Sequence, residues 1–133
     1  WGAADGPMSN LGVNAMQSSI AALTIGTSGA IRVMIDQPLV DKKARTFTYA
    51  LDETHWVIGG ATNSGASVLA WLKEQVFADK LTLEEMTTMA EKVPPGSQGL
   101  IFHPYLGGER APIWDASLVL AMNTVKQRWR VLL

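Results

Sequence analysis

Two pairs of short apolar segments dominate the first half of the chain. Residues 21–25 and 30–35 are rich in apolar and β-branched side chains, and Gly-Thr-Ser-Gly lies between them at residues 26–29. This pattern predicts a β-hairpin with its tip at residues 26–29. Residues 46–51 and 55–60 carry aromatic and β-branched side chains on either side of Asp52, Glu53 and Thr54. They predict a second hairpin or a bent strand pair.

Helical patterns precede and follow these strands. Asp5, Gly6 and Pro7 predict a helix start, because proline is tolerated in the first helical turn. Between residues 64 and 77, apolar side chains recur every three or four positions and predict a helix. We expect this helix to pack on the hairpin sheet through Val68, Trp71 and Leu72, with Trp71 in the core.

The second half of the chain is less regular. Thr82 and Glu85 form a capping-box pattern at a helix start, and two prolines and a glycine at residues 94–96 end that helix. Residues 99–106 predict a buried strand that leads into a loop rich in glycine and charge. Residues 118–133 are apolar nearly all round and predict a helix that packs poorly against the rest.

Composition narrows the class of protein. The 133 residues are 47% hydrophobic and 17% charged, with a formal net charge of -1, which is typical of a globular domain and disfavours nucleic acid as a partner. There is no cysteine and there are two histidines, so we expect no disulfide, no thiolate chemistry and no structural metal. We interpret both histidines, His55 and His103, as strand-end residues, and Trp56 as a core residue.

The start of the chain bears on location and completeness. It has no basic-then-apolar signal pattern, and no apolar run approaches the ~18 residues of a membrane span. We therefore expect a cytoplasmic protein with no membrane partner. Trp1 opens an already organised segment, which indicates a piece of a longer protein.

The tip at residues 26–29 is the first candidate site. Free backbone N–H groups in a glycine-rich turn bind anions, and the hydroxyls of Thr27 and Ser28 add donors. The alternative is a plain turn that uses glycine for positive φ. No lysine follows the glycines, so the tip is not a Walker A loop, and the strand that follows excludes a dinucleotide fingerprint.

Other candidates leave a structural alternative open. Asp5 is either a general base at a helix N-terminus or a helix cap. The small residues 59–61 and 64–66 either let a ligand approach the backbone or let strand and helix pack closely. Glu109, Arg110 and Asp115 either form a site or, as we favour, belong to a solvated loop with a local ion pair.

Four segments in order resemble one family. They read DGPMSNLGV, LTIGTSGAIR, WVIGGATNSGASVLAWL and GLIFHPYLGGERAPIWD. From about Gly2 to Ala116 the chain is similar to the FGGY family of carbohydrate kinases, and within it to members that phosphorylate gluconate. The resemblance implies an α/β (α+β) fold, a partial actin-like or ribonuclease H-like ATPase domain with antiparallel hairpins and packed helices.

The resemblance also implies a division of the chain. Residues 1–18 would end the first kinase domain and carry the catalytic aspartate, and residues 19–116 would form the first half of the C-terminal domain. After residue 116 the family continues with an Arg-Gly turn and an aromatic-rich strand that this chain lacks. We therefore expect residues 117–133 to be a divergent tail, of the kind that a frameshift or truncation produces.

The family's site residues carry over position by position. Asp5 would be the catalytic base, the tip would bind ATP phosphates, and the remaining residues would contact nucleotide or sugar, with no metal ligand among them. The phosphate residues are Gly26, Thr27, Ser28 and Gly29; the nucleotide residues are Gly65 and Leu69; the sugar-side residues are Gly6 and Ala30.

The implied reaction is ATP- and Mg²⁺-dependent phosphorylation of D-gluconate to 6-phosphogluconate. The partners are ATP and a sugar or sugar acid, the full-length enzyme is expected as a homodimer, and the chain alone is expected to be inactive. The alternatives are xylulose or another sugar as substrate, a non-catalytic actin-like nucleotide-binding module, and a β-rich binding domain without nucleotide.

Overall fold

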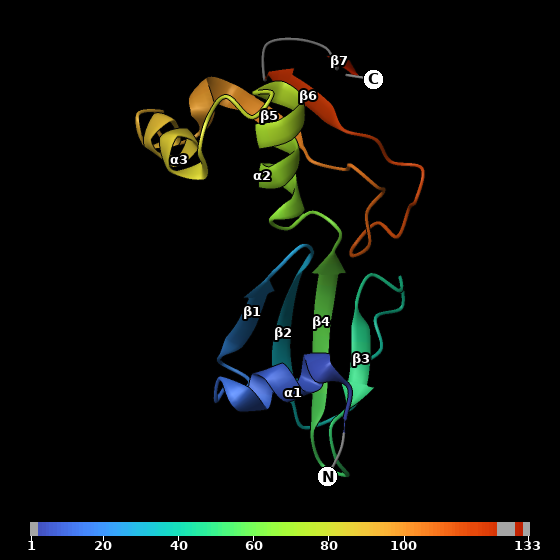
Figure 1. Cartoon of the computed structure of the whole chain (residues 1–133). Helices are drawn as coiled ribbons and strands as arrows, with labels where there is room; N and C mark the ends of the chain where they lie inside the picture. Colours follow the sequence, from blue (N-terminus) through green and yellow to red (C-terminus); the bar gives the residue numbers. More distant parts are fainter. Residues whose placement is uncertain (1–2, 125–129, 132–133) are drawn as a thin grey trace.

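The computed structural model describes residues 3–124 and 130–131, and a four-stranded sheet forms its centre (Figure 1). All its strands are antiparallel, in the order β1-β2-β4-β3. Their bounds are β1 Ala21–Ile25, β2 Gly29–Ile35, β3 Phe47–Ala50 and β4 Trp56–Thr62. Both predicted hairpins are therefore confirmed, with strand ends shifted by one or two residues.

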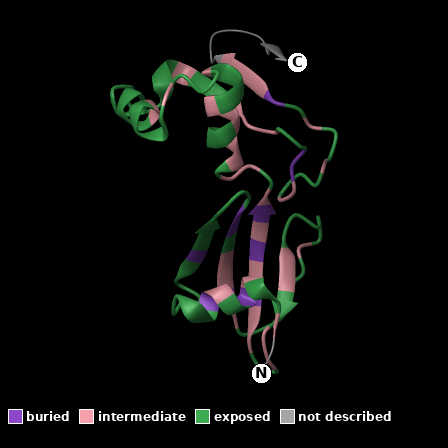
Figure 2. Ribbon diagram, viewed as in Figure 1, coloured by how far each residue is buried: buried purple, intermediate pink, exposed green. Residues whose placement is uncertain are grey.

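Helix α1, Asp5–Gly12, lies across one face of this sheet (Figure 1). Beneath it β4 alternates between buried and half-buried residues, so one face of the strand forms the core. Figure 2 shows the buried residues gathering where α1 covers β2 and β4. The buried apolar side chains there are Ala15, Ala22, Ala30, Met34, Val57 and Ala61.

The opposite face of the sheet is open. Leu23, Ile25 and Ile31 are 65%, 67% and 52% exposed. Since side chains alternate along a strand, these residues and Ala30 point to opposite faces. Within the described residues, the sheet thus has one covered and one uncovered apolar face.

Helix α2, Ser67–Trp71, does not lie on the sheet as expected. It continues beyond the end of β4 and runs away from the strands, and a π-helical turn, η1 Leu72–Val76, follows it (Figure 1). Periodicity identifies the apolar face of a helix but not the element that this face meets, which explains the wrong prediction. Trp71 and Trp56 are half-buried and not core residues, because no layer covers them in the described chain.

The capping box is confirmed. Helix α3, Leu83–Glu91, begins after Thr82, whose hydroxyl accepts the Glu85 N–H at 3.1 Å while the Glu85 carboxylate accepts the Thr82 N–H at 2.7 Å. A 3₁₀ turn, η2 Ser97–Gly99, leads into β5, Leu100–His103, which confirms the strand but shortens it. The predicted burial of this strand is wrong, because Leu100 and Ile101 are each 42% exposed.

The helix expected from residue 118 is wrong for the residues that the structure describes. Residues Ala121–Thr124 form β6, which pairs with all four residues of β5, and Arg130–Val131 form β7. Leu120 is buried and Leu118 half-buried, so this part is better packed than expected, while Trp129 lies outside the described residues. An evenly apolar run suits helix or strand alike, and the free edge of β5 decides for strand.

In the described ranges 3–124 and 130–131, no helix has the length and hydrophobicity to cross a membrane.

Candidate active site

The β1–β2 tip is exposed and tied to the start of α2. The carbonyl of Gly26 accepts the Ala66 N–H at 2.8 Å, and the carbonyl of Thr27 accepts the hydroxyl of Ser67 at 2.8 Å. Gly26, Thr27 and Ser28 are exposed as predicted, whereas Gly29 is the buried first residue of β2. The carbonyls of Gly26 and Thr27 thus anchor the tip to the start of α2.

The donors of the tip remain available. Among the described residues, neither the amide N–H nor the hydroxyl of Thr27 or Ser28 has a hydrogen-bond partner. An exposed turn with free amides and hydroxyls is suited to anion binding. The arrangement therefore has the donors that the anion-binding interpretation requires.

Positive φ does not explain the tip glycines. Gly26 and Gly29 are not among the described glycines with positive φ. A Cβ at Gly26 would meet only the Ser28 carbonyl oxygen at 3.8 Å, whereas a Cβ at Gly29 would lie 3.0 Å from the Thr62 methyl group. The fold therefore requires a small residue at Gly29, while glycine at Gly26 leaves the outer surface of the turn open.

Gly65 is required by close approach. A Cβ there would lie 2.5 Å from the Gly26 carbonyl oxygen and 2.6 Å from the Ser28 carbonyl carbon. At Gly65 the small residue therefore serves close packing, because it lets the backbone of the tip approach the start of α2.

Asp5 is the first residue of α1 and is exposed. The N-cap position belongs to Ala4, which makes no side-chain cap bond, so the cap interpretation of Asp5 is wrong. One carboxylate oxygen of Asp5 accepts the N–H of Gly6 at 2.8 Å. The positive end of the helix dipole favours a carboxylate at this position.

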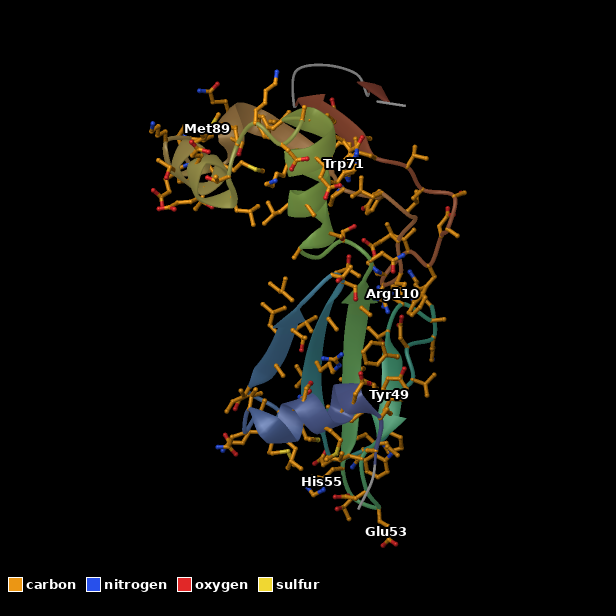
Figure 3. All side chains as sticks on the ribbon, in the orientation of Figure 1. Tyr49, Glu53, His55, Trp71, Met89 and Arg110 are labelled. Atoms are coloured by element: carbon orange, nitrogen blue, oxygen red, sulfur yellow. The ribbon has the colours of Figure 1, made fainter. Side chains whose placement is uncertain are left out.

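A cavity of about 430 Å³ brings Asp5 together with the tip. It lies on the face of the sheet that α1 covers, and Figure 3 shows Arg110 at the tip end of this sheet and His55 at the other end. The predicted site residues that line it are Asp5, Gly6, Ser28, Gly29 and Ala30, and Arg110 from the candidate loop lines it too. Lining residues that sequence reasoning did not assign to a role include Thr24, Arg32, Phe47, Tyr49 and Trp114.

A second cavity, of about 630 Å³, lies on the opposite face and reaches the start of α2. Gly65 and Leu69 line it, together with the exposed apolar residues of β1 and β2. Gly29 and Ala30 line both cavities, whereas Thr27 lines neither. The structure therefore separates the predicted site residues into two adjoining groups.

Glu109 is a buried structural residue and not part of a solvated loop. It is 7% exposed and accepts hydrogen bonds from the Thr62 hydroxyl at 2.7 Å and the N–H groups of Asn63 and Arg110 at 2.9 and 2.7 Å. Burial alone would raise the pKa of Glu109, but these hydrogen bonds outweigh it and hold the pKa below its usual value. They fasten the loop after β5 to the end of β4.

The local ion pair expected in this loop is also wrong for the described residues. The Arg110 guanidinium donates to the Thr62 carbonyl at 2.9 Å, and the Asp115 carboxylate accepts the Ser117 N–H at 2.8 Å.

His55 is satisfied at a strand end as predicted, because its Nδ1 lies 2.9 Å from Asp52. The Thr54 N–H contributes most to lowering the Asp52 pKa to about 2.

Arg32 is a site residue that sequence reasoning missed. A signal for it was present, since alternation places Arg32 on the same face of β2 as the buried residues Ala30 and Met34. A charged side chain on the core face of a strand needs a partner or a ligand.

Comparison with known proteins places this geometry in a family. The C-terminal domain of the FGGY family of carbohydrate kinases matches residues 21–131. A gluconokinase of Bacillus licheniformis is 50% identical over 123 residues, which cover 86% of this chain and 24% of that protein. The chain thus spans about a quarter of the length of this relative.

Two solved structures resemble the chain closely. A gluconate kinase from Lactobacillus acidophilus has a TM-score of 0.86 and 46% identity, covering 96% of this chain and 25% of that protein. A ligand-bound xylulose kinase from the same species has a TM-score of 0.85 and 47% identity over the same shares. These neighbours confirm the predicted fold class.

Proposed function

The chain belongs to the FGGY family of carbohydrate kinases, and from that membership we propose that it forms the catalytic centre segment of a sugar kinase. Residues 1–18 end the first domain, residues 19–116 begin the C-terminal domain, and residues 117–133 are a divergent tail. The match to the C-terminal domain begins at residue 21, which supports the first boundary. It continues past residue 116 to residue 131, so it does not support a divergent tail.

The reaction that this site supports best is phosphoryl transfer from ATP to a sugar hydroxyl. The observation that carries the proposal is the cavity that joins the Asp5 carboxylate to the β1–β2 tip. Asp5 takes the proton of the hydroxyl as its oxygen attacks the γ-phosphorus, and ADP leaves with the electrons of the broken bond. Gly6 and Ala30 form the sugar side of this cavity.

The phosphate chain of ATP lies against the tip in this proposal. The free amides and hydroxyls of Thr27 and Ser28 donate to phosphate oxygens, Gly26 leaves the outer surface of the turn open, and Gly29 begins β2 directly behind it. Gly65 and Leu69 contact the nucleotide in the second cavity. This assignment uses both cavities, with the tip between them.

Mg²⁺ would be bound together with the nucleotide. In the part of the chain that the structure describes, no group of three or more His, Asp or Glu side chains is placed to hold a metal ion. Protein-bound Mg²⁺ commonly keeps waters and phosphate oxygens as ligands, so the ATP phosphates would supply part of its coordination. When bound, the ion neutralises charge that develops on the transferred phosphoryl group.

We propose D-gluconate as the substrate and 6-phosphogluconate as the product. The 50% identity to a gluconokinase and the small side chain of Ala30 in the sugar cavity support a sugar acid. Xylulose is the second candidate, because a xylulose kinase structure is 47% identical.

A non-catalytic nucleotide-binding module would have no use for a carboxylate beside the tip. A homodimeric full-length enzyme and a cytoplasmic location stay predictions.

The test is made on the full-length kinase that contains this chain, since we propose that the chain alone does not turn over. ADP release is measured with gluconate, xylulose and other sugars, and mass spectrometry identifies the product. We expect the highest kcat/KM for gluconate. A higher kcat/KM for xylulose would move the proposal to the second candidate, and ATP binding without any sugar-dependent turnover would refute the kinase assignment.

A further inference from the structure

The cavity of Asp5 carries an excess of positive charge. Two guanidinium groups, of Arg32 and Arg110, line it, and Asp5 is its only acidic residue. In residues 3–124 and 130–131, neither arginine forms an ion pair with a carboxylate. A half-buried cavity with a surplus cation is complementary to an anionic ligand.

The side chain of Arg32 is held in place by neutral groups. Its Nη1 donates to the Thr24 hydroxyl at 3.2 Å and to the Ser9 hydroxyl at 3.4 Å. A Cβ at Gly6 would lie 3.1 Å from Nε and 3.2 Å from Nη2, so the guanidinium passes directly beneath Gly6. These neighbours fix its orientation and leave its charge unmatched, with Nε and Nη2 unbonded among the described residues.

The two arginines reach the cavity from different elements. Arg110 comes from the loop after β5 and bonds to the carbonyl of Thr62, the residue that pairs with Gly29 beside the tip. Arg32 comes from β2, and its Nη1 bonds to Thr24, which pairs with Ala30. The Arg32 guanidinium therefore lies near Gly6 and the Thr24–Ala30 pair, on the side of the cavity that the proposed function gives to the sugar.

We propose that Arg32 binds the carboxylate of a sugar-acid substrate and selects it over neutral sugars. This inference rests on the proposed function and adds the group that recognises the acid. A guanidinium matches a carboxylate with N–H donors in a fixed geometry, and Nε and Nη2 of Arg32 have no partner among the described residues, on the edge where Gly6 carries no side chain. Ala30, two residues earlier on the same face of β2, leaves the sugar chain room to reach it.

The test compares Arg32→Met and Arg32→Lys in the full-length kinase, with gluconate and the neutral ketose xylulose as substrates. Methionine keeps the length of the stem and removes the charge, and lysine keeps the charge and loses the paired donors. For Arg32→Met we expect KM for gluconate to rise by about 10- to 100-fold, with KM for xylulose and for ATP changed less than about threefold. Arg32→Lys should show a smaller rise, again for gluconate alone.

Lys42→Met is the matched control, because Lys42 is exposed, lines no part of this cavity and also loses one positive charge. It should leave both sugar constants unchanged. Equal losses with gluconate and xylulose, a raised KM for ATP, or an unchanged KM for gluconate would each overturn the assignment of Arg32. Should Arg32→Met fail to fold, Arg32→Lys decides by the same comparison. A wild-type enzyme inactive on gluconate would instead overturn the proposed function.

Discussion

Replacing Gly65 by alanine should displace the β1–β2 tip, because backbone atoms of the tip occupy the space that a side chain needs. The new Cβ would lie 2.5 Å from the Gly26 carbonyl oxygen and 2.6 and 2.7 Å from the carbonyl carbon and oxygen of Ser28. No side-chain rotation relieves these contacts. The tip must therefore move by about 1 Å to restore ordinary van der Waals separation.

The magnitude follows from the bonds that such a movement strains. Three hydrogen bonds join the tip to the start of α2, from the N–H of Ala66 and from the N–H and hydroxyl of Ser67, at 2.8, 3.3 and 2.8 Å. At about 1 kcal/mol each, their loss lowers the free energy of unfolding by about 2–3 kcal/mol. If the tip holds the phosphates, a displacement of ~1 Å lowers kcat/KM for ATP by up to about a hundredfold.

Substitutions at two other glycines distinguish a loss of stability from a loss of ATP binding. A Cβ at Gly12, the last residue of α1, meets nothing within 4 Å, so Gly12→Ala should not lower Tm and should leave the kinetics unchanged. A Cβ at Gly26 meets only the Ser28 carbonyl oxygen at 3.8 Å, so Gly26→Ala should keep Tm and raise KM for ATP. Thermal melts and steady-state kinetics on the full-length kinase measure both effects. A Gly65→Ala enzyme with unchanged Tm and kcat/KM for ATP would refute the close-approach argument.

Three further predictions concern single side chains. Asp5→Asn keeps an oxygen for the Gly6 N–H but removes the base, so kcat should fall about 10²- to 10⁴-fold with Tm unchanged; near-normal turnover would contradict a catalytic role. Thr27→Val should raise KM for ATP about tenfold and leave sugar binding, measured by titration, intact. The pKa of Glu109 is lowered in the folded state, so its contribution to stability is present above its unfolded pKa and is lost as pH falls through the folded pKa. In urea unfolding, the difference in free energy of unfolding between wild type and Glu109→Gln should therefore shrink from neutral pH toward pH ~3. A difference that stays constant over this range would contradict the argument.

Local signals predicted both hairpins of the first half and one capping box correctly. The hairpin at residues 21–35 depends on neighbouring residues, as does the capping box of Thr82 and Glu85, and the structure confirms both. Asp5 and Gly29 are distant in sequence and line one cavity. The prediction that they belong to one site rested on the resemblance, which assigns them to one reaction. Composition and periodicity alone did not link them.

Errors arose where a non-local partner decides the structure. The residues that pair with β5 come from beyond residue 120, and no local pattern specifies that pairing. Glu109 was interpreted as solvated because its hydrogen-bond donors Thr62 and Asn63 lie more than forty residues earlier. Alternation puts Arg32 on the same face of β2 as Ala30 and Met34, but the burial of that face depends on β4 and α1, which alternation alone does not specify.

Strand β2 explains why one short segment serves two cavities. Side chains alternate along it, so Ala30 and Arg32 face α1 and the cavity of Asp5, while Ile31 faces the cavity of Gly65. At Gly29 and Ala30 the strand is the shared wall of both cavities, and a wall that a ligand must approach from two sides cannot carry bulky side chains. The sequence Gly-Thr-Ser-Gly-Ala meets this condition with small residues throughout, and the first large polar side chain on the α1 face, Arg32, comes where the shared wall ends. The transition from small residues to a cation along β2 thus keeps the shared wall open to ligands while it supplies one guanidinium to the cavity of Asp5.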